Sequence, residues 1–314
     1  MITVAGEALI DLVIDPSGSV TALVGGAGFN VARAVARLGG DCQYLGKLSD
    51  DGFGEQLSSA LDRVGVRIAV ERATSAPTTL AIARLDELGV AEYRFYLDGT
   101  SAGLLTTDDV PVEILDGSTA FTIGGLALLV EPTASSLIAL IAHKPPGATI
   151  LLDPNCRPGA VADLEGYREM IDTVLRQVDI VKVSTDDLRL LRPESTSRNA
   201  ARSLLELGPA AVLVTDGGAP VAIHTESHER TVSVPVVEVV DTIGAGDAFV
   251  AGFLTWWTAR ARADHDAGDS DALVGACTAA ARVAAAACTV QGADLPADFR
   301  WSTQVAAISE PRGT

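Results

Sequence analysis

From residue 119 onward, short apolar runs alternate with helix-spaced segments, and this alternation is the strongest constraint on the fold. The expected elements, strand and helix in turn, are 120–123, 134–143, 149–153, 167–178, 180–183, 200–207 and 211–215. Consecutive strand–helix units favour a mostly parallel sheet with helices packed on both faces. The sequence therefore predicts an α/β fold in which a central sheet lies between two layers of helices.

The first hundred residues partly follow the same rhythm. We expect the main body to include a strand at 2–5, a helix from Asn30 to Leu38, a strand at Cys42–Leu45 and a helix at Gly54–Val64. Residues 79–85 and 90–97 instead alternate apolar and polar side chains around a turn, as antiparallel strands do. Together with 8–24, the stretch 78–97 is expected to form a small sheet set apart from the main body. We expect residues 1–314 to form one domain.

The charge of the chain excludes some partners. With 314 residues and a formal net charge of −18, binding to nucleic acid or to an anionic membrane surface is not expected. The longest apolar stretch, 126–142, contains Glu131-Pro132 and does not read as a membrane span. A phosphorylated small molecule remains compatible, because local backbone N–H groups can hold a phosphate inside an acidic protein.

The cysteines and histidines give no metal motif. His224 and His228 are four apart, but they lie at the expected tip of a hairpin rather than on a helix, so no zinc site is predicted. Reduced and mostly buried thiols, in a cytoplasmic protein, are the expected state of Cys42, Cys156, Cys277 and Cys288.

The segment 236–254 concentrates the chemistry. A β-branched run, expected to be a strand, ends at Asp241; the turn Gly244-Ala245-Gly246 follows, and Asp247 opens an apolar helix. Glycines before a helix expose N–H groups where the helix dipole already favours an anion. A carboxylate beside such an anion hole can take a proton from a hydroxyl while the hole holds a phosphoryl group.

Other glycine motifs fit this segment less well. No Lys-Ser/Thr pair follows the second glycine, as a Walker A loop requires, and the third glycine of a dinucleotide fingerprint is missing. An ordinary helix N-terminus with an Asp near its cap is the simpler alternative. The coincidence of two glycines, a threonine and two aspartates favours the anion hole.

Further polar residues follow the expected strands. Open α/β sheets bind ligands beyond the carboxyl ends of their strands, so these residues form the candidate site. They are Asp11, which interrupts an apolar strand, Asn30 at a helix start after Gly25–Phe29, and the stretches Asp153–Arg157, Lys182–Asp187 and Thr215–Gly218 at strand ends. Taken singly, each could be only a turn former or a helix cap.

The pattern resembles the PfkB-type carbohydrate kinases of the ribokinase superfamily. Two segments carry the resemblance, Gly25–Gly39 and Asp241–Phe249, and Gly46–Gly54 and Asp153–Arg157 agree with it. It covers nearly the whole chain. It implies a three-layer αβα body with a β-sheet lid, Mg-ATP as the phosphoryl donor and a sugar hydroxyl as the acceptor.

The resemblance also implies roles for residues of the acceptor side and of the motif. Asp247 would be the general base, and the turn Gly244–Gly246, with the N–H groups of Ala245, Gly246 and Asp247, would form the anion hole. Asp11, Gly26 and Asn30 would bind the sugar. Arg157 could meet the carboxylate of an acid sugar, although fructokinase-like sequences also carry an arginine there.

On the donor side, the resemblance implies ATP contacts from Lys182, Ser184, Thr215, Gly217 and the stretch from Ala287 to Gly292. Asp187 would act on magnesium through water. Asp241, with carbonyl groups near Gly292, resembles a monovalent-cation site, so K⁺ is a further expected ligand.

Departures from the family pattern bear on the substrate. Ser184 and Asp187 stand where many members have Asn and Glu, which puts the magnesium role of Asp187 in question, and Ala27 stands where ribokinases tend to have Lys. Fructose is the expected acceptor. Alternatives are 2-keto-3-deoxygluconate, or ribose or a nucleoside.

Two other classes of protein remain as alternatives. A non-catalytic sugar or nucleotide sensor would be expected to have lost Asp247 or the glycine turn, and both are present. A dinucleotide-dependent oxidoreductase lacks its complete fingerprint. The chain could be a monomer or a homodimer paired through the lid; the sequence leaves open the sugar, the hydroxyl, the cation dependence, the oligomeric state and any allosteric regulation.

Overall fold

The computed structural model describes residues 1–86, 91–260 and 266–301. Within these residues, a central sheet has the strand order β13-β12-β11-β10-β9-β8-β1-β4-β5. All of its pairings are parallel except those of β11 with β12 and of β12 with β13. Its strands are β1 (Ile2–Ala5), β4 (Cys42–Leu45), β5 (Arg67–Ile68), β8 (Ala120–Gly124), β9 (Thr149–Asp153), β10 (Ile180–Ser184), β11 (Ala211–Thr215), β12 (Val221–Thr225) and β13 (Glu229–Val232).

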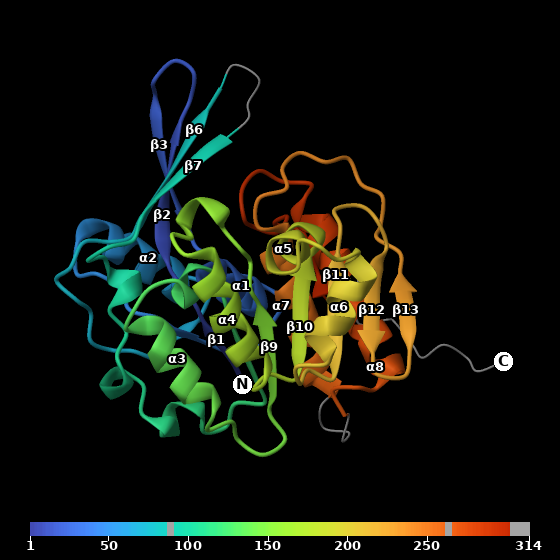
Figure 1. The fold of residues 1–314 in the computed structure, drawn as a ribbon. Helices are drawn as coiled ribbons and strands as arrows, with labels where there is room; N and C mark the ends of the chain where they lie inside the picture. Colours follow the sequence, from blue (N-terminus) through green and yellow to red (C-terminus); the bar gives the residue numbers. More distant parts are fainter. Residues whose placement is uncertain (87–90, 261–265, 302–314) are drawn as a thin grey trace.

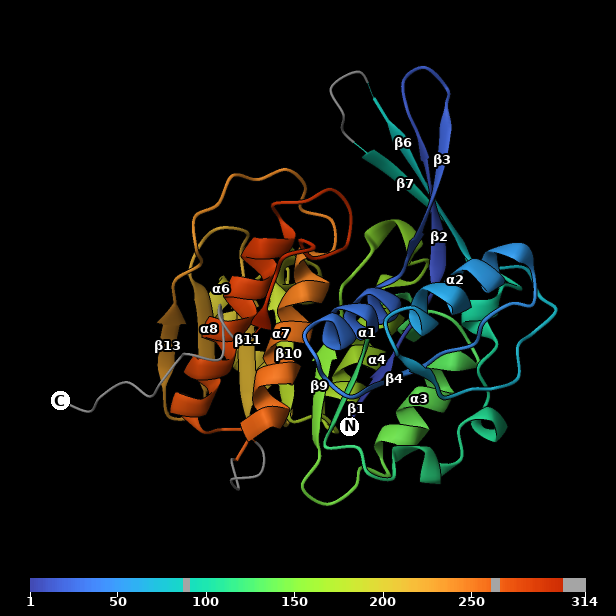
Figure 2. The same ribbon diagram turned by 180° about the vertical axis from the view of Figure 1, so that it is seen from behind.

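Helices cover both faces of this sheet (Figure 1; Figure 2). One layer consists of α1 (Ala27–Arg37), α2 (Gly52–Asp62), α7 (Ala245–Arg260) and α8 (Ser270–Ala287). The other consists of α3 (Thr133–Ile141), α4 (Leu164–Leu175), α5 (Thr185–Leu191) and α6 (Ser197–Leu205). Each layer closes its own hydrophobic core against the sheet. The predicted three-layer α/β fold is confirmed.

A second sheet projects beyond the carboxyl ends of the central strands (Figure 1). Its order is β3-β2-β6-β7, with β2 parallel to β6 and antiparallel pairs on either side. The strands are β2 (Leu9–Ile14), β3 (Val20–Gly25), β6 (Leu80–Leu85) and β7 (Ala91–Tyr96). The expected small sheet is therefore present, although most of the turn expected between β6 and β7 falls at 87–90, outside the described residues.

Short 3₁₀ turns complete the connections. They lie at Ser101–Gly103, Thr107–Asp109, Val112–Leu115, Gly125–Leu128 and Pro158–Ala160. Those at 101–115 carry the chain from the small sheet back to β8, a stretch in which the sequence indicated no regular element.

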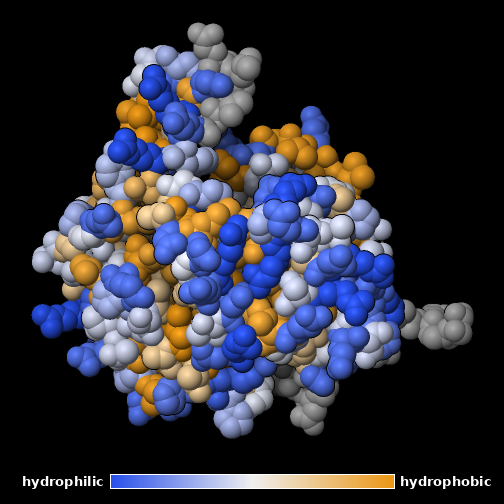
Figure 3. Space-filling view, in the orientation of Figure 1, coloured by the Kyte–Doolittle hydropathy of each residue, from blue (hydrophilic) through white to orange (hydrophobic). Residues whose placement is uncertain are grey.

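The strand expected before Asp241 is wrong. Residues 233–239 form neither helix nor strand, and Val236, Val239 and Val240 are exposed. Figure 3 shows apolar surface at the upper right of the molecule, where this segment runs. The backbone N–H of Val240 donates instead to the carbonyl of Cys288, at 2.8 Å. A β-branched run becomes a strand only where a neighbouring strand offers a ladder of partners, and here it finds a helix end.

Two helices also differ from expectation at their starts. α1 begins at Ala27, three residues before the expected Asn30, with Gly26 as its N-cap. α5 was not expected; Ser184 caps it by accepting a hydrogen bond from the N–H of Asp187. Both differences arise at polar or glycine-rich junctions, where apolar periodicity has not yet begun.

The thiols and the helices agree with the sequence in two further respects. All four cysteines are free, and three of them are buried. In the described part of the chain, every helix is too short or too polar to cross a bilayer.

Candidate active site

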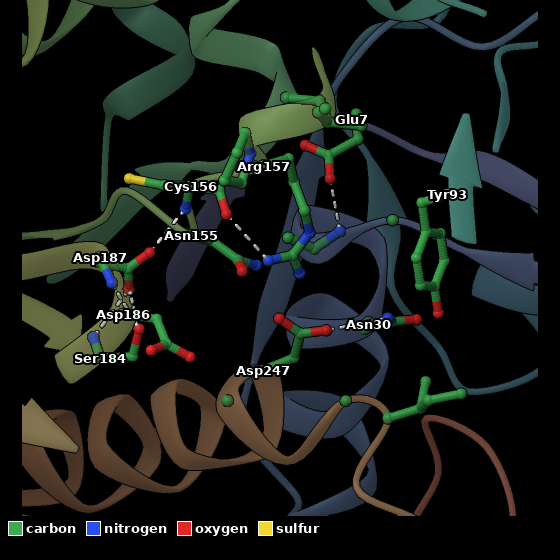
Figure 4. Close-up of a pocket in the computed structure, with 18 of the residues that line it drawn as sticks. Glu7, Asn30, Tyr93, Asn155, Cys156, Arg157, Ser184, Asp186, Asp187 and Asp247 are labelled. Carbon is green, nitrogen blue, oxygen red and sulfur yellow. Dashed lines mark hydrogen bonds between the residues drawn. The ribbon is translucent and has the colours of Figure 1, made fainter. Parts of the chain in front are cut away.

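A cavity of about 860 Å³ lies beneath the small sheet, at the carboxyl ends of the central strands. Its walls come from β2, from the start of α1, from the segments after β9 and β10, and from the start of α7 (Figure 4). The predicted site residues that line it are Asp11, Gly26, Asn30, Arg157, Lys182, Ser184, Asp187, Thr215, Gly244, Gly246 and Asp247.

Asp247 sits in the first turn of α7, facing this cavity (Figure 4). Its side chain is buried, and Oδ2 accepts a hydrogen bond of 2.9 Å from Nδ2 of Asn30. Burial raises the pKa of Asp247 to about 7, and the Asn30 hydrogen bond limits the increase. A carboxyl group with such a pKa can both accept and release a proton near neutral pH.

The turn before Asp247 has the shape that the sequence suggested. Gly244 has φ +74°, a region that favours glycine, and α7 begins directly after it. Ala245 donates its N–H to the carbonyl of Thr242, at 3.2 Å. Within the described residues, the N–H groups of Gly246 and Asp247 have no protein acceptor. Two of the three expected anion-hole donors are therefore free in this structure.

The acceptor side combines a tight turn with buried carboxyl groups. Gly26 has φ +108°, and a Cβ there would collide with the carbonyl oxygen of Glu7. Burial and then the nearby Glu7 raise the pKa of Asp11 to about 6, although the charge of Arg157 acts against this. Oδ1 of Asn30 is buried and has no hydrogen-bond partner among the described residues.

Arg157 brings a positive charge to this side of the cavity. It is solvent-exposed and donates one hydrogen bond, of 3.3 Å, to the carbonyl of Cys156. The guanidinium lies among the side chains of Glu7, Asn155 and Asp247 (Figure 4). No ion pair joins it to a described carboxylate.

Lys182 is already neutralised by the protein. Its Nζ lies 3.0 Å from Oδ2 of Asp153, and both side chains are buried. Burial by itself lowers the pKa of Lys182, but Asp153 and then Asp187 outweigh that effect and raise it. The ammonium group would lie 3.2 Å from a Cβ placed on Gly246, so a fixed positive charge stands beside the anion-hole turn.

Asp187 has its carboxylate occupied by protein donors. Oδ1 accepts the N–H of Cys156 at 2.8 Å, and Oδ2 accepts the N–H and the hydroxyl of Ser184, each at 2.7 Å. The side chain also lines the cavity. Contact with a metal through water, rather than directly, suits this arrangement.

Five predicted residues lie outside the cavity wall. Ala245 is in the turn itself, and Gly217 lies in the turn after β11, with φ +52°. Ala287 is buried at the end of α8 and faces a small cavity behind Asp247. Gly292 and Asp241 meet each other: the N–H of Gly292 donates to Oδ2 of Asp241 at 2.9 Å.

The cavity wall also carries Glu7 and Tyr93, which were not predicted as site residues, and Asn155, from the predicted stretch Asp153–Arg157. Glu7 accepts the N–H groups of Ala27 and Ala127, at 2.8 and 3.3 Å, and so ties two loops together. Asn155 adopts φ +43°, and Tyr93 reaches the cavity from β7. Glu7 had a signal, a charged residue in an apolar run; Tyr93 had none, because its position depends on the small sheet.

Taken together, the fold and this cavity fit a phosphotransferase: a buried carboxyl group lies beside free N–H groups at a helix N-terminus, beneath the small sheet. Comparison with known proteins identifies the family. Residues 1–300 match the model described as the pfkB family carbohydrate kinase, and the chain belongs to this family. It is an ATP-dependent sugar kinase.

Relatives that are named as sugar kinases agree with this family assignment. The fructokinase of Rhizobium leguminosarum bv. trifolii is 34% identical over 259 residues, which cover 81% of this chain and 78% of the relative. Fructokinase-1 of Zea mays is 36% identical over 259 residues, covering 79% of this chain and 80% of the relative.

Solved structures show the same architecture. The fructokinase of Xylella fastidiosa with bound ATP superimposes with a TM-score of 0.85 at 30% identity, covering 93% of both chains. The aminoimidazole riboside kinase of Salmonella enterica, complexed with aminoimidazole riboside and an ATP analog, gives 0.80 at 28% identity, covering 93% of this chain and 94% of the other.

Proposed function

We propose that this chain is a fructokinase that transfers the γ-phosphoryl group of Mg-ATP to a primary hydroxyl of fructose. The observation that carries the proposal is Asp247: a buried carboxyl group with a pKa of about 7 on the cavity wall, beside the free N–H of Gly246. The names of the relatives support fructose as the acceptor.

The charges around the acceptor side favour a neutral sugar over an acid sugar. Glu7, Asp11 and Asp247 all line the cavity, and Arg157 is the cation that faces them. The ammonium of Lys182 does not shift this balance, because Asp153 pairs with it. A sugar carboxylate would meet one guanidinium among three carboxyl groups, whereas hydroxyl groups can donate hydrogen bonds to all three.

In the proposed mechanism, Asp11, Gly26 and Asn30 hold the sugar, and the unpartnered Oδ1 of Asn30 accepts a hydrogen bond from one of its hydroxyls. Asp247 accepts the proton of the attacking hydroxyl. The N–H groups of Gly246 and Asp247 receive the charge that develops on the transferring phosphoryl group. Ser184, Thr215 and Lys182 face the side from which the nucleotide phosphates would approach.

Magnesium fits the donor set as a partner of the nucleotide. No cluster of three or more potential ligands occurs among the His, Cys, Asp and Glu residues that the structure describes. Mg²⁺ keeps several waters and binds through few carboxylates plus substrate phosphates, which suits the occupied carboxylate of Asp187. When bound, the ion would neutralise charge on the phosphates.

The monovalent cation is proposed at Asp241. Its carboxylate accepts the N–H groups of Ile243 and Gly292, at 3.0 and 2.9 Å, so it joins the anion-hole segment to the loop after α8.

The path of ATP and its adenine is proposed to be lined by Thr215, Gly217 and the stretch 287–292.

We also propose that the small sheet acts as the lid of a single kinase domain and as the surface of a homodimer. Tyr93 reaches the cavity from this sheet, and Val20, Leu23 and Tyr96 leave apolar surface exposed on it. Leu23→Glu should turn a dimer into a monomer in light scattering; an unchanged mass would count against this surface. A cytoplasmic location remains a prediction.

The deciding experiment is an ATP-consumption screen over about a dozen acceptors, each measured with and without K⁺. It should include fructose, 2-keto-3-deoxygluconate, ribose and aminoimidazole riboside. Fructose is expected to give the highest kcat/KM. A higher value for the acid sugar would overturn the charge argument, and a higher value for the riboside would move the assignment to nucleosides.

A further inference from the structure

One carboxylate, Asp294, joins two parts of the site that the chain places far apart. Its Oδ1 lies 2.6 Å from Nη1 of Arg37, and its Oδ2 lies 3.0 Å from Nη2 of Arg33. Nη2 of Arg37 also donates to the carbonyls of Leu295 and Pro296, at 3.1 and 3.2 Å. The loop that follows α8 is thereby fastened to α1 by several hydrogen bonds.

The two arginines share a stripe of α1 with Asn30. Arg33 and Arg37 are three and seven residues after Asn30, a spacing that places all three on one side of a helix. Asn30 donates to Asp247. One stripe of α1 therefore holds both the proposed general base and the loop containing Asp294.

That loop supports the anion-hole segment from behind. Cys288 accepts the N–H groups of Val240 and Asp241, and Gly292 donates to the Asp241 carboxylate. Ala293 packs directly against the turn: a Cβ built on Gly244 would lie 2.5 Å from the Cβ of Ala293. A shift of the loop by a fraction of an ångström would therefore be felt at Gly244.

We propose that Asp294 is a positioning residue for the anion hole. By fixing the loop against α1, it keeps the N–H groups of Gly246 and Asp247 in register with the sugar-binding end of the same helix. This inference rests on the proposed function, since it takes those N–H groups to receive the phosphoryl group. Asp294 itself does not line the main cavity.

The test compares Asp294→Ala and Asp294→Asn with the wild type. We expect kcat to fall by about 10- to 100-fold, because a displaced catalytic group can cost about 10²-fold even when the mutation is remote. The KM for sugar should stay within about threefold, because the acceptor contacts are intact. Binding of ADP with magnesium and aluminium fluoride, a mimic of the transferring phosphoryl group, should weaken as much as kcat falls, while binding of ADP alone should not.

Glu229→Gln is the matched control. It breaks the ion pair with Arg198, and its side chain is 35% exposed, against 41% for Asp294, but it lies away from the site. This variant should keep wild-type kcat. The asparagine variant preserves the side-chain volume. If a lowered Tm shows that the alanine variant folds poorly, the asparagine variant still tests the role of Asp294.

A kcat within about twofold of wild type in a folded Asp294→Asn protein would overturn the inference, as would equal weakening of ADP and of its aluminium fluoride complex. Failure of the proposed function looks different, because the wild type itself would then not phosphorylate fructose. The nucleotide-binding comparison needs no sugar and remains decisive in that case.

Discussion

The starts of α5 and α7 line the same cavity, and each carries an aspartate in the first turn. The hydrogen-bonding groups of the two helix starts nevertheless differ: those of α5 are paired within the protein, and several of those of α7 are not. At α5, the hydroxyl of Ser184 accepts the N–H of Asp187, and the Asp187 carboxylate accepts three protein donors. At α7, two N–H groups have no acceptor in the described chain, and Asp247 has Asn30 as its donor.

This difference separates a helix start that stabilises the fold from one whose groups are free to react with a ligand. Satisfied groups at a helix start stabilise the fold, by about 0.5–2 kcal/mol for a cap. Unsatisfied N–H groups and a carboxyl group with a raised pKa cost stability but remain available to a ligand. We therefore expect the phosphoryl transfer at the start of α7. The start of α5 is expected to support the wall of the same cavity.

The largest effect is expected at the α7 start itself. Asp247→Ala removes the proton acceptor and should lower kcat by about 10²–10⁴-fold. Affinities for sugar and ATP, measured by calorimetry, should change by only a few-fold. A variant that keeps more than about a hundredth of the wild-type rate would show that Asp247 is not the general base.

The turn should be the next most sensitive point. Gly244→Ala places a methyl group against Ala293 at a residue with φ +74°, so the turn must move, and kcat should fall by about 10- to 100-fold. Gly39→Ala is the matched control, since Gly39 has φ +83° and open space around its Cβ position. Equal losses of kcat in both variants would attribute the effect to backbone strain alone.

The dependence of kcat/KM on pH should also be set by the carboxyl group at the start of α7. Asp247 must be ionised to accept a proton, so kcat/KM should fall about tenfold per pH unit as pH drops below about 7. Asn30→Ala removes a hydrogen bond that lowers the pKa of Asp247, and the midpoint should move to higher pH. A midpoint near 6 that disappears in Asp11→Asn would instead assign the profile to Asp11.

The smallest effect on turnover is expected at the α5 start. Asp187→Ala leaves the N–H groups of Cys156 and Ser184 without their acceptor and should lower the free energy of unfolding by about 1–2 kcal/mol. The KM for Mg-ATP should rise, and kcat should fall by less than about tenfold. A loss of kcat as large as that of Asp247→Ala would remove the distinction between the two helix starts.

Much of this fold could be predicted from the sequence, because the βα units have strong local periodicity. The failures lie where tertiary partners decide. Val236–Val240 has the composition of a strand, but the sheet ends at β13 and the segment bonds to Cys288 instead. The start of α5 is polar, so its apolar face could not be recognised over seven residues.

The candidate site divides in the same way. Asp247 and Asn30 follow glycine-rich turns and Asp11 interrupts an apolar strand, and the structure brings all three to one cavity. Tyr93 and Asp294 could not be predicted, because the first depends on the pairing of β6 with β7 and the second on two arginines more than 250 residues away. Neither relation leaves a local pattern in the sequence.

The position of β2 provides a site for a reporter label. Its first residues are buried next to the cavity, and Asp11 follows them, whereas the tip of the β2–β3 hairpin at Asp15–Ser19 is largely exposed. Exposed hairpin tips tolerate added sequence well. A fluorophore attached at Ser17 would be carried by the hairpin whose first strand contains Asp11, and its emission could report on the acceptor site from an exposed position.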